Sequence, residues 1–185
     1  DISSVGALIN YIELTQKENV PLVKNLNIIN PEKFMQIDDF SFNSLEIFKK
    51  TDGEKSGSLI SVIDKTNTPL GGRLLKEYIK FPLIEIEEIK KRHDLVKIFI
   101  DETNLLTSLR NFLKETPDVE RAISRITANI NNPRDLIIVL NFLKTSQNIF
   151  KILKDYHNKK FKTLYLEESI AKKLLNLENL IEKTI

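Results

Sequence analysis

The sequence predicts a mainly α-helical fold, a multi-helix core bundle with two short strands near the N-terminus and a long C-terminal helix. Three observations support this prediction. Only five glycines and six prolines interrupt the 185 residues. Long stretches repeat apolar residues at the helical spacing i, i+3, i+4 and i+7. Thr-Pro or Asn-Pro pairs directly precede three of these stretches, and a capping residue followed by proline is a typical helix start.

The first forty residues predict one helix and then two extended segments. Ser3 or Ser4 can cap the helix, because a hydroxyl oxygen accepts a hydrogen bond from a free backbone N–H group. The apolar residues that share one face of this helix are Val5, Leu8, Ile9 and Ile12. The runs NLNII (25–29) and FMQID (34–38) partly alternate around Asn30-Pro31, which is typical of short strands.

A further short helix is expected before the first of the Thr-Pro pairs. Asp38 or Asp39 can cap it. Its apolar residues are Leu45, Ile47 and Phe48. The following segment, TDGEKSGS (51–58), holds two of the five glycines and predicts an exposed loop.

Each of the three Xaa-Pro pairs begins a predicted helix. The pairs are Thr68-Pro69, Thr116-Pro117 and Asn132-Pro133. The apolar residues after the first are Leu70, Leu74, Leu75, Tyr78 and Ile79, after the second Val119, Ala122, Ile123 and Ile126, and after the third Leu136, Leu140 and Leu143. Pro82 ends the first of these helices near Phe81, because a proline disfavours helical backbone in the residue before it. Another helix is expected from about Ile84, with Ile89, Val96 and Phe99 on its apolar face.

The C-terminal segment predicts a long helix with a narrow apolar seam. Its seam residues are spaced by 4, 3, 4 and 4 and are Ile170, Leu174, Leu177, Ile181 and Ile185. Such a seam is typical of coiled coils and needs a partner helix. We therefore expect a helical core domain over residues 1–165 and the start of a long helix over 166–185, in a chain that is a segment of something larger.

Composition excludes several classes of protein. With 28 basic and 26 acidic residues the net charge is +2, which does not indicate a nucleic-acid-binding module by itself. Cysteine is absent, so there is no disulfide framework and no thiolate metal site. No apolar run reaches the roughly 18 residues of a membrane-spanning helix, and the N-terminus lacks the basic region of a signal peptide. We expect a cytoplasmic protein that does not enter a membrane.

The glycine pair Gly71-Gly72, followed by Arg73, has two interpretations. A phosphate-binding loop needs glycines between a strand and a helix, followed by Lys-Ser or Lys-Thr. Here the pair follows the proline that starts a helix, and no Lys-Ser or Lys-Thr comes after it. A glycine in a helix costs about 1 kcal/mol relative to alanine. The favoured explanation is that the missing Cβ atoms let another helix approach closely, with Arg73 reaching a carboxylate or a helix C-terminus.

Other polar clusters support structure better than catalysis. His93 and His157 are far apart and have no companions at metal-ligand spacing, and no serine lies in a nucleophile-elbow pattern. Arg121 and Arg125 share a helix face, with Arg134 and Asp135 opening the next helix, which favours a network of ion pairs. A basic group could contact a DNA backbone or form a solvated loop, and its members are Lys154, Lys159, Lys160 and Lys162. No catalytic, cofactor or metal site is predicted.

Several separated stretches resemble the MutS family of DNA mismatch-recognition ATPases. The strongest is SLISVIDKTNTPLGGRLLKEYIKFPL, which matches the family pattern at Asp64, Thr66, Thr68, Pro69, Gly71, Arg73, Leu75 and Lys76. VGALINYIELTQK is similar to the family's first core helix through Tyr11 and Thr15-Gln16. DVERAISRITANINNPRDLIIVL is similar to another family element through Asp118, Glu120, Arg121, Arg125, Pro133, Arg134, Asp135 and Leu136. One departure is that Phe42 and Asn43 stand where the family usually has two basic residues.

The resemblance implies that the chain is the helical core between a mismatch-reading domain and an ATPase domain. It implies a connector domain before it, lever helices that carry a DNA clamp, and ATP and Mg²⁺ bound elsewhere in a homodimeric parent. Residues 166–185 would be the start of a lever. The core would then couple the ATPase domain to mismatched duplex DNA without being an enzyme itself. The residues expected to carry coupling are Gly71, Gly72, Arg73, Arg121, Arg125, Arg134 and Asp135.

Two other functions remain open at this point. One is a free-standing helical module that binds a partner protein through the terminal seam. The other is the core of a MutS-like protein outside mismatch repair. The helix with Tyr11 and Thr15-Gln16 favours the mismatch-repair branch.

Overall fold

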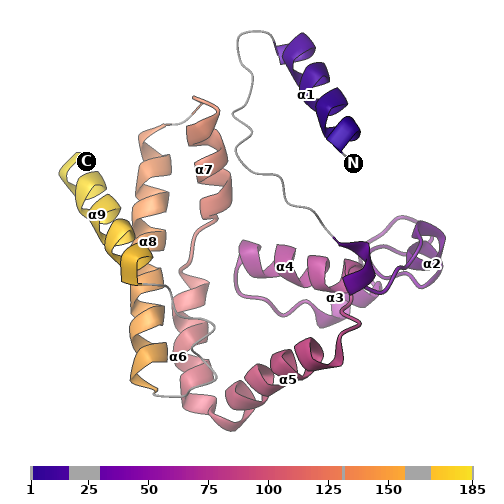
Figure 1. The fold of residues 1–185 in the computed structure, drawn as a ribbon. Coiled ribbons are helices and arrows are strands. Elements are labelled where there is room, and N and C mark those ends of the chain that lie inside the picture. Colours follow the sequence, from indigo (N-terminus) through magenta and orange to yellow (C-terminus); the bar gives the residue numbers. More distant parts are fainter. Residues whose placement is uncertain (1, 17–29, 131, 157–167, 185) are drawn as a thin grey trace.

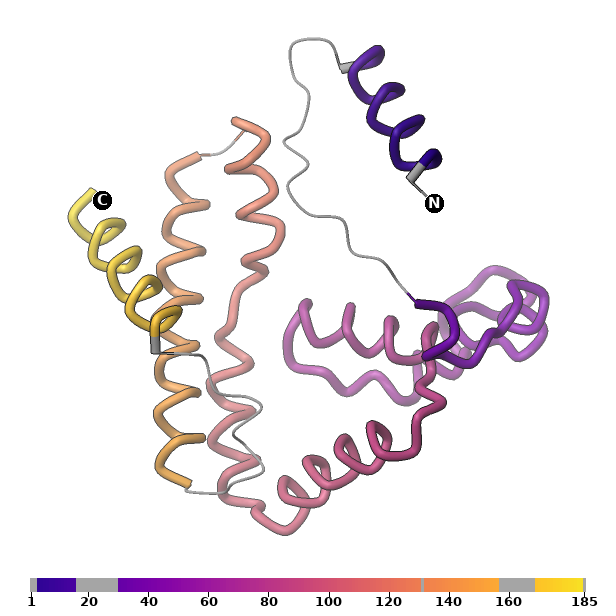
Figure 2. The backbone as a smooth tube through the Cα atoms, viewed as in Figure 1, coloured from indigo at the N-terminus to yellow at the C-terminus, as the bar shows by residue number. Residues whose placement is uncertain are grey.

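The computed structural model describes residues 2–16, 30–130, 132–156 and 168–184, and in these ranges the fold is mainly α (Figure 1). Four helices form a bundle, namely α6 (Thr103–Lys114), α7 (Val119–Thr127), α8 (Pro133–Asp155) and α9 (Glu168–Thr184). A smaller unit contains α2 (Asp39–Ser44), α3 (Leu59–Ile63) and α4 (Pro69–Lys80). Helix α5 (Ile86–Asp101) connects this unit to the bundle (Figure 2). Helix α1 (Ile2–Gln16) lies apart from both (Figure 1).

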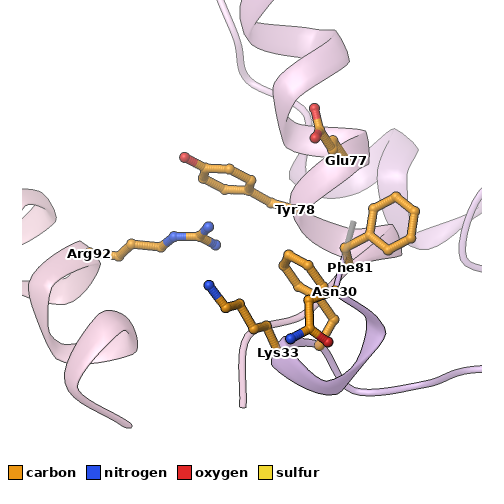
Figure 3. A pocket seen from close by; sticks show the side chains of 7 residues that line it. Asn30, Lys33, Glu77, Tyr78, Phe81 and Arg92 are labelled. Atoms are coloured by element: carbon orange, nitrogen blue, oxygen red, sulfur yellow. The ribbon is translucent and has the colours of Figure 1, made fainter. Parts of the chain in front are cut away.

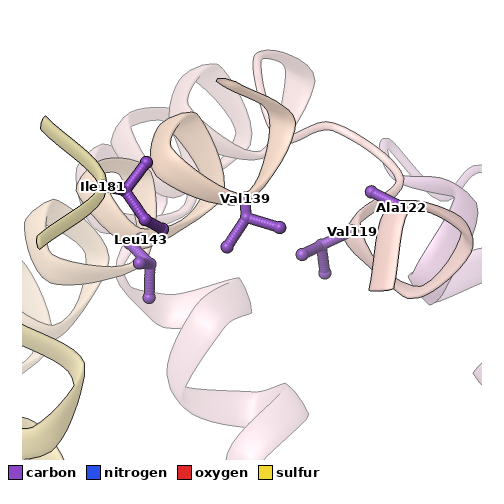
Figure 4. Close-up of a cluster of buried hydrophobic side chains, with 5 residues drawn as sticks. All are labelled: Val119, Ala122, Val139, Leu143 and Ile181. Atoms are coloured by element: carbon purple, nitrogen blue, oxygen red, sulfur yellow. The ribbon is translucent and has the colours of Figure 1, made fainter. Parts of the chain in front are cut away.

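The long helix predicted after Asn132-Pro133 is confirmed as α8, and it is the centre of the bundle. Its first half packs against α7 and α9, where Val119, Ala122, Val139, Leu143 and Ile181 form a buried cluster (Figure 4). Its second half packs against α6, where Leu153 is buried with Leu105 and Leu109. Burying a leucine or isoleucine side chain contributes about 1.5–3 kcal/mol, so these two clusters hold the bundle together.

Helix α8 is also long and apolar enough, by length and composition alone, to cross a membrane. The expectation that no apolar segment reaches membrane-spanning length is therefore corrected at α8. Three neighbouring helices pack against α8, namely α6, α7 and α9. These contacts bury Val139, Leu143 and Leu153 of α8 within the helical bundle.

Two of the three predicted Xaa-Pro helix starts are confirmed. The Thr68 side chain accepts a hydrogen bond from the backbone N–H of Gly71 at 2.9 Å, and Pro69 opens α4. Asn132 caps α8 in a capping box, in which the Asp135 side chain in turn accepts a hydrogen bond from the Asn132 N–H at 3.1 Å. Helix α4 ends at Lys80, as Pro82 predicts.

The prediction that Thr116 caps the helix after the second of these pairs is wrong. Its hydroxyl instead donates a hydrogen bond to the carbonyl of Phe112 at 3.1 Å, one turn back in α6. Helix α7 begins later, at Val119, with Asp118 as the residue before it. A threonine hydroxyl can satisfy a helix C-terminus as well as an N-terminus, and here the helix before it was not expected.

The smaller unit contains no strand in its described residues, which corrects the second predicted strand. Asn30 caps a short 3₁₀ helix at Pro31–Lys33, and Phe34 forms only an isolated bridge with Leu83. The other run, residues 25–29, lies outside the described residues. Asp38 caps α2, as expected, by accepting a hydrogen bond from the N–H of Ser41 at 2.8 Å.

Helix α2 is shorter than predicted, because it ends at Ser44, before Leu45, Ile47 and Phe48. Glu46 adopts a left-handed conformation with φ of 50°, which turns the chain out of the helix. The Glu46 carboxylate then accepts hydrogen bonds from the N–H and hydroxyl of Thr51, at 2.8 and 2.9 Å. These bonds fix the start of the expected loop, which holds Gly53 and Gly57 at positive φ.

Three further differences concern helix boundaries and partners. Helix α1 begins at Ile2, so Ser3 and Ser4 lie inside it rather than capping it. Helices α3 and α6 were not expected. The seam of α9 has its partner within this chain, because Leu174 and Ile181 pack against the α8 cluster. Ile170 and Leu177 are exposed, and Ile185 lies outside the described residues.

Candidate functional site

The N-terminus of α4 is closely packed against the loop that leads into it. A Cβ atom added to Gly71 would lie 3.0 Å from the hydroxyl oxygen of Thr68 and 3.4 Å from the Cβ of Thr66. A Cβ atom on Gly72 would lie 3.3 Å from the hydroxyl oxygen of Thr66. The expected close approach of a second helix is therefore not what these glycines accommodate among the described residues. They make room for the capping loop of their own helix.

Arg73, the next residue, joins α4 to the start of α7. Its two terminal nitrogens donate to the two carboxylate oxygens of Asp118, at 3.0 and 2.6 Å. One of them also lies 2.6 Å from the carboxylate of Glu120. We call Arg73, Asp118 and Glu120 the α4–α7 junction. A bidentate arginine–carboxylate pair fixes orientation as well as distance, so the junction resists both sliding and rotation.

Arg125 joins α7 to α8 in a similar way. Its Nε donates to Asp135 Oδ1 at 2.9 Å, and its Nη2 bonds the same oxygen. Asp135 is only 1% exposed, and its second oxygen accepts the Asn132 N–H of the capping box. We call Arg125, Asp135 and Asn132 the α7–α8 junction. The sequence prediction of an ion-pair network at the start of α8 agrees with this arrangement.

Both junctions shift the pKa values of their members in the direction that favours charge. The hydrogen bonds from Arg73 lower the pKa of Asp118, and those from Arg125 lower the pKa of Asp135. The same bonds raise the pKa of Arg73 and of Arg125. Carboxylates held ionised in this way are poor general acids and bases near neutral pH, so the junctions are suited to holding helices rather than to proton transfer.

The other predicted residues lie outside the two junctions. Arg121 is 76% exposed and reaches Asp118, the residue directly before its own helix, at 3.3 Å, so it does not bridge to another element. Arg134 is exposed, and its backbone N–H bonds the Asn132 side chain. Of the four lysines considered for DNA contact, Lys154 is exposed near the end of α8. The remaining three, Lys159, Lys160 and Lys162, lie outside the described residues.

Phe42, which stands where the family usually has a basic residue, is a core residue of the smaller unit. It is 8% exposed and stacks on Phe48, with ring centroids 5.6 Å apart. Asn43 is exposed beside it. A charged side chain at position 42 would be buried without a partner in this packing, which is costly, so phenylalanine fits this site.

Three partners in these junctions were not among the residues predicted to carry function. Asp118, Glu120 and Asn132 are each within the motifs that resemble the family, but nothing in their spacing shows that Asp118 lies opposite Arg73, 45 positions earlier in the chain. In the part of the chain that the structure describes, no group of three or more His, Asp or Glu side chains is placed to hold a metal ion.

Comparisons with known proteins agree with the resemblance seen in the motifs. The family profile described as MutS domain III matches residues 41–185. A DNA mismatch repair protein MutS from Rickettsia bellii (strain OSU 85-389) is 35% identical over 187 residues, which is 100% of this chain and 21% of that protein. MutS from Dehalococcoides mccartyi (strain CBDB1) is 37% identical over 81% of the chain and 18% of that protein. MutS from Ruegeria sp. (strain TM1040) is 34% identical over 84% of the chain.

The chain therefore spans about a fifth of the length of the curated relatives it matches. The profile covers both junctions and all of the bundle helices. The Rickettsia relatives match the whole length of the chain, α1 included. The chain belongs to the MutS family of DNA mismatch repair proteins, as a segment of the family's domain III.

Proposed function

We propose that this segment is a mechanical coupler within a mismatch-recognition ATPase. In this proposal the parent binds ATP and Mg²⁺ in another domain and grips mismatched duplex DNA with a clamp carried beyond α9. The core transmits displacements between them, and a connector domain precedes it. The parent acts as a cytoplasmic homodimer, and this segment has no catalytic role of its own.

The observation that supports this proposal best is the α4–α7 junction. Beyond the α5 connection, it ties the smaller unit to the bundle through a bidentate ion pair. Leu70 of α4 also packs against the cluster shared by α7, α8 and α9. A force on the smaller unit can therefore reach α9 through α7 and α8 without passing along α5.

The physical properties of this path suit transmission. Packed cores shift between discrete arrangements rather than deforming continuously, so a displacement of α7 is passed on instead of being absorbed. The α7–α8 junction adds a second fixed orientation, and α8 and α9 are linked by Lys144–Glu182 at 2.5 Å and by Gln147–Glu178. Coupling of this kind acts equally in both directions.

The test compares Arg73→Gln with Arg121→Gln in the full-length parent. Both variants remove one arginine that contacts Asp118, but only Arg73 reaches it from another element. The affinity for a mismatched duplex is measured with and without ATP. We expect Arg73→Gln to reduce the effect of ATP on affinity at least about fivefold, the lower end of typical allosteric couplings, and Arg121→Gln to leave it unchanged. An unchanged ATP effect in Arg73→Gln would count against the junction as the route of coupling.

A further inference from the structure

A cleft outside both junctions is lined by two cations, Lys33 and Arg92, that form no ion pair within the described residues. It has a volume of about 340 Å³ and lies between the 3₁₀ turn at Pro31–Lys33, the end of α4 and α5. The residues that line it are Asn30, Lys33, Phe34, Glu77, Tyr78, Phe81 and Arg92 (Figure 3). Arg92 lies in the charged stretch KKRHD (90–94), which is typical of a solvated helix face. Its side chain is nevertheless half-buried.

Arg92 is held in a fixed orientation with its binding edge free. Its guanidinium carbon lies 3.7 Å from the centre of the Tyr78 ring, so one face of the cation is stacked on an aromatic surface. Stacking uses the face of the planar guanidinium and leaves its N–H edge available for a planar, bidentate acceptor. Lys33 lines the same cleft (Figure 3). Two cations in one cleft repel one another, and an anion bound between them would relieve this repulsion.

The walls of the cleft are also held in place by backbone bonds. The N–H of Ile84 donates to the Lys33 carbonyl at 3.3 Å, and the N–H of Met35 donates to the Pro82 carbonyl at 2.8 Å. Phe34 and Phe81 pack together with ring centroids 5.7 Å apart. The segments that carry the two cations therefore do not have to be brought together when a ligand arrives, which lowers the free-energy cost of binding.

No ion pair joins Lys33 or Arg92 to a carboxylate within the described ranges. The positive charges of Lys33 and Arg92 both help to lower the pKa of Glu88. Glu88 pairs with Lys91 at 2.5 Å, however, and Lys91 is the main cause of its lowered pKa. Glu77 lines the opposite side of the cleft, pointing away from the two cations (Figure 3). The donors available to a ligand are the Arg92 edge, the Lys33 ammonium group and the Asn30 amide.

We infer that this cleft receives an acidic side chain, Asp or Glu, from a part of the parent protein outside these 185 residues. About four fifths of the length of the relatives lies outside the region matched by this chain, so such a segment is available. Duplex DNA fits less well, because Glu77 also lines the cleft and would repel a row of phosphates. A single carboxylate can meet the two cations without meeting Glu77, which lies on the opposite side of the cleft (Figure 3).

Zero-length cross-linking of the full-length parent tests this inference. A water-soluble carbodiimide joins a lysine amine to a carboxylate only where the two are in contact, and peptide mass spectrometry identifies the pair. We expect Lys33 to be joined to an Asp or Glu outside residues 1–185. Lys97, an exposed lysine of α5, is the internal control and should form no such link.

Variants of Arg92 test whether this residue helps to hold the carboxylate that Lys33 is joined to. Arg92→Gln should lower the yield of the Lys33 cross-link about tenfold, the factor expected from losing one charge-assisted hydrogen bond. Arg92→Lys keeps the charge but loses the planar edge, so its yield should be intermediate. Circular dichroism checks that both variants keep the fold.

Three results would overturn the inference. One is a Lys33 that joins only to acids of this chain such as Glu32 or Glu88, and another is a Lys33 that forms no cross-link at all. The third is a Lys33 that is protected from modification only when mismatched duplex is present, which would assign the cleft to phosphate. The inference requires a longer parent but not the coupling role, so failure of the Arg73 test leaves it standing.

Discussion

At the scale of single residues, the glycine pair lies in close packing as expected, but against a different segment from the one expected. The sequence indicates that Gly71 and Gly72 remove Cβ atoms to allow close packing. The structure agrees that packing is tight, but the neighbour is the loop holding Thr66 and Thr68. A side chain at Gly71 would press on the hydroxyl that caps α4, so the glycine protects the cap. Glycines within a predicted helix indicate that a neighbouring segment packs closely there. They do not indicate which segment it is.

The acidic residues of the junctions predict how stability depends on pH. Their pKa values are lower in the folded chain than the ordinary 3.8, so the unfolded chain takes up a proton first as the pH falls. Their contribution is therefore complete above the ordinary pKa and is lost as the pH falls below it toward the folded-state value.

The change to test is Asp135→Asn, because Asp135 is buried and holds Arg125. We expect the variant to melt at a lower temperature than the unmodified chain at neutral pH. This difference in melting temperature should shrink between about pH 5 and pH 3. Thermal melts followed by circular dichroism measure it. Asp155→Asn, at the exposed far end of α8, is the matched control. A difference that stays constant with pH would show that the charge of Asp135 contributes nothing.

At the scale of helices, the same sequence pattern had two outcomes. Thr68-Pro69 and Asn132-Pro133 begin helices, whereas Thr116-Pro117 lies in the linker between two helices. The difference lies in what comes before each pair. Helix α6 ends at Lys114, two residues before Thr116, and its free carbonyls compete for the hydroxyl. Helix α6 was missed because no capping pair precedes it, so its start had no local marker.

This difference can be measured by removing each side chain. Asn132→Ala removes a capping box, so we expect it to lower the free energy of unfolding by about 1 kcal/mol. Thr116→Ala removes a single bond to a helix C-terminus and should have a smaller effect. Denaturant unfolding of both variants in parallel gives the comparison. Equal losses, or a larger loss for Thr116→Ala, would mean that Thr116 has a capping role that the structure does not show.

At the scale of the whole molecule, the helical class and the order of most helices could be predicted, because their capping and apolar spacing are local properties. The second predicted strand was wrong, because alternation around Pro31 fits a 3₁₀ turn as well as a strand. The pairing of Arg73 with Asp118 and the cleft at Arg92 could not be predicted. Both depend on segments far apart in sequence, which only the folded chain brings together.

The central claim is that displacement passes from the smaller unit through the α4–α7 junction to α9. Hydrogen–deuterium exchange of the full-length parent, with and without ATP, tests it most directly by following the amides of α9. We expect ATP to change the protection of α9 in the unmodified protein and in Arg121→Gln, and to have little effect on α9 in Arg73→Gln. If α9 responds to ATP equally in all three proteins, displacement does not travel through this junction and the account is contradicted.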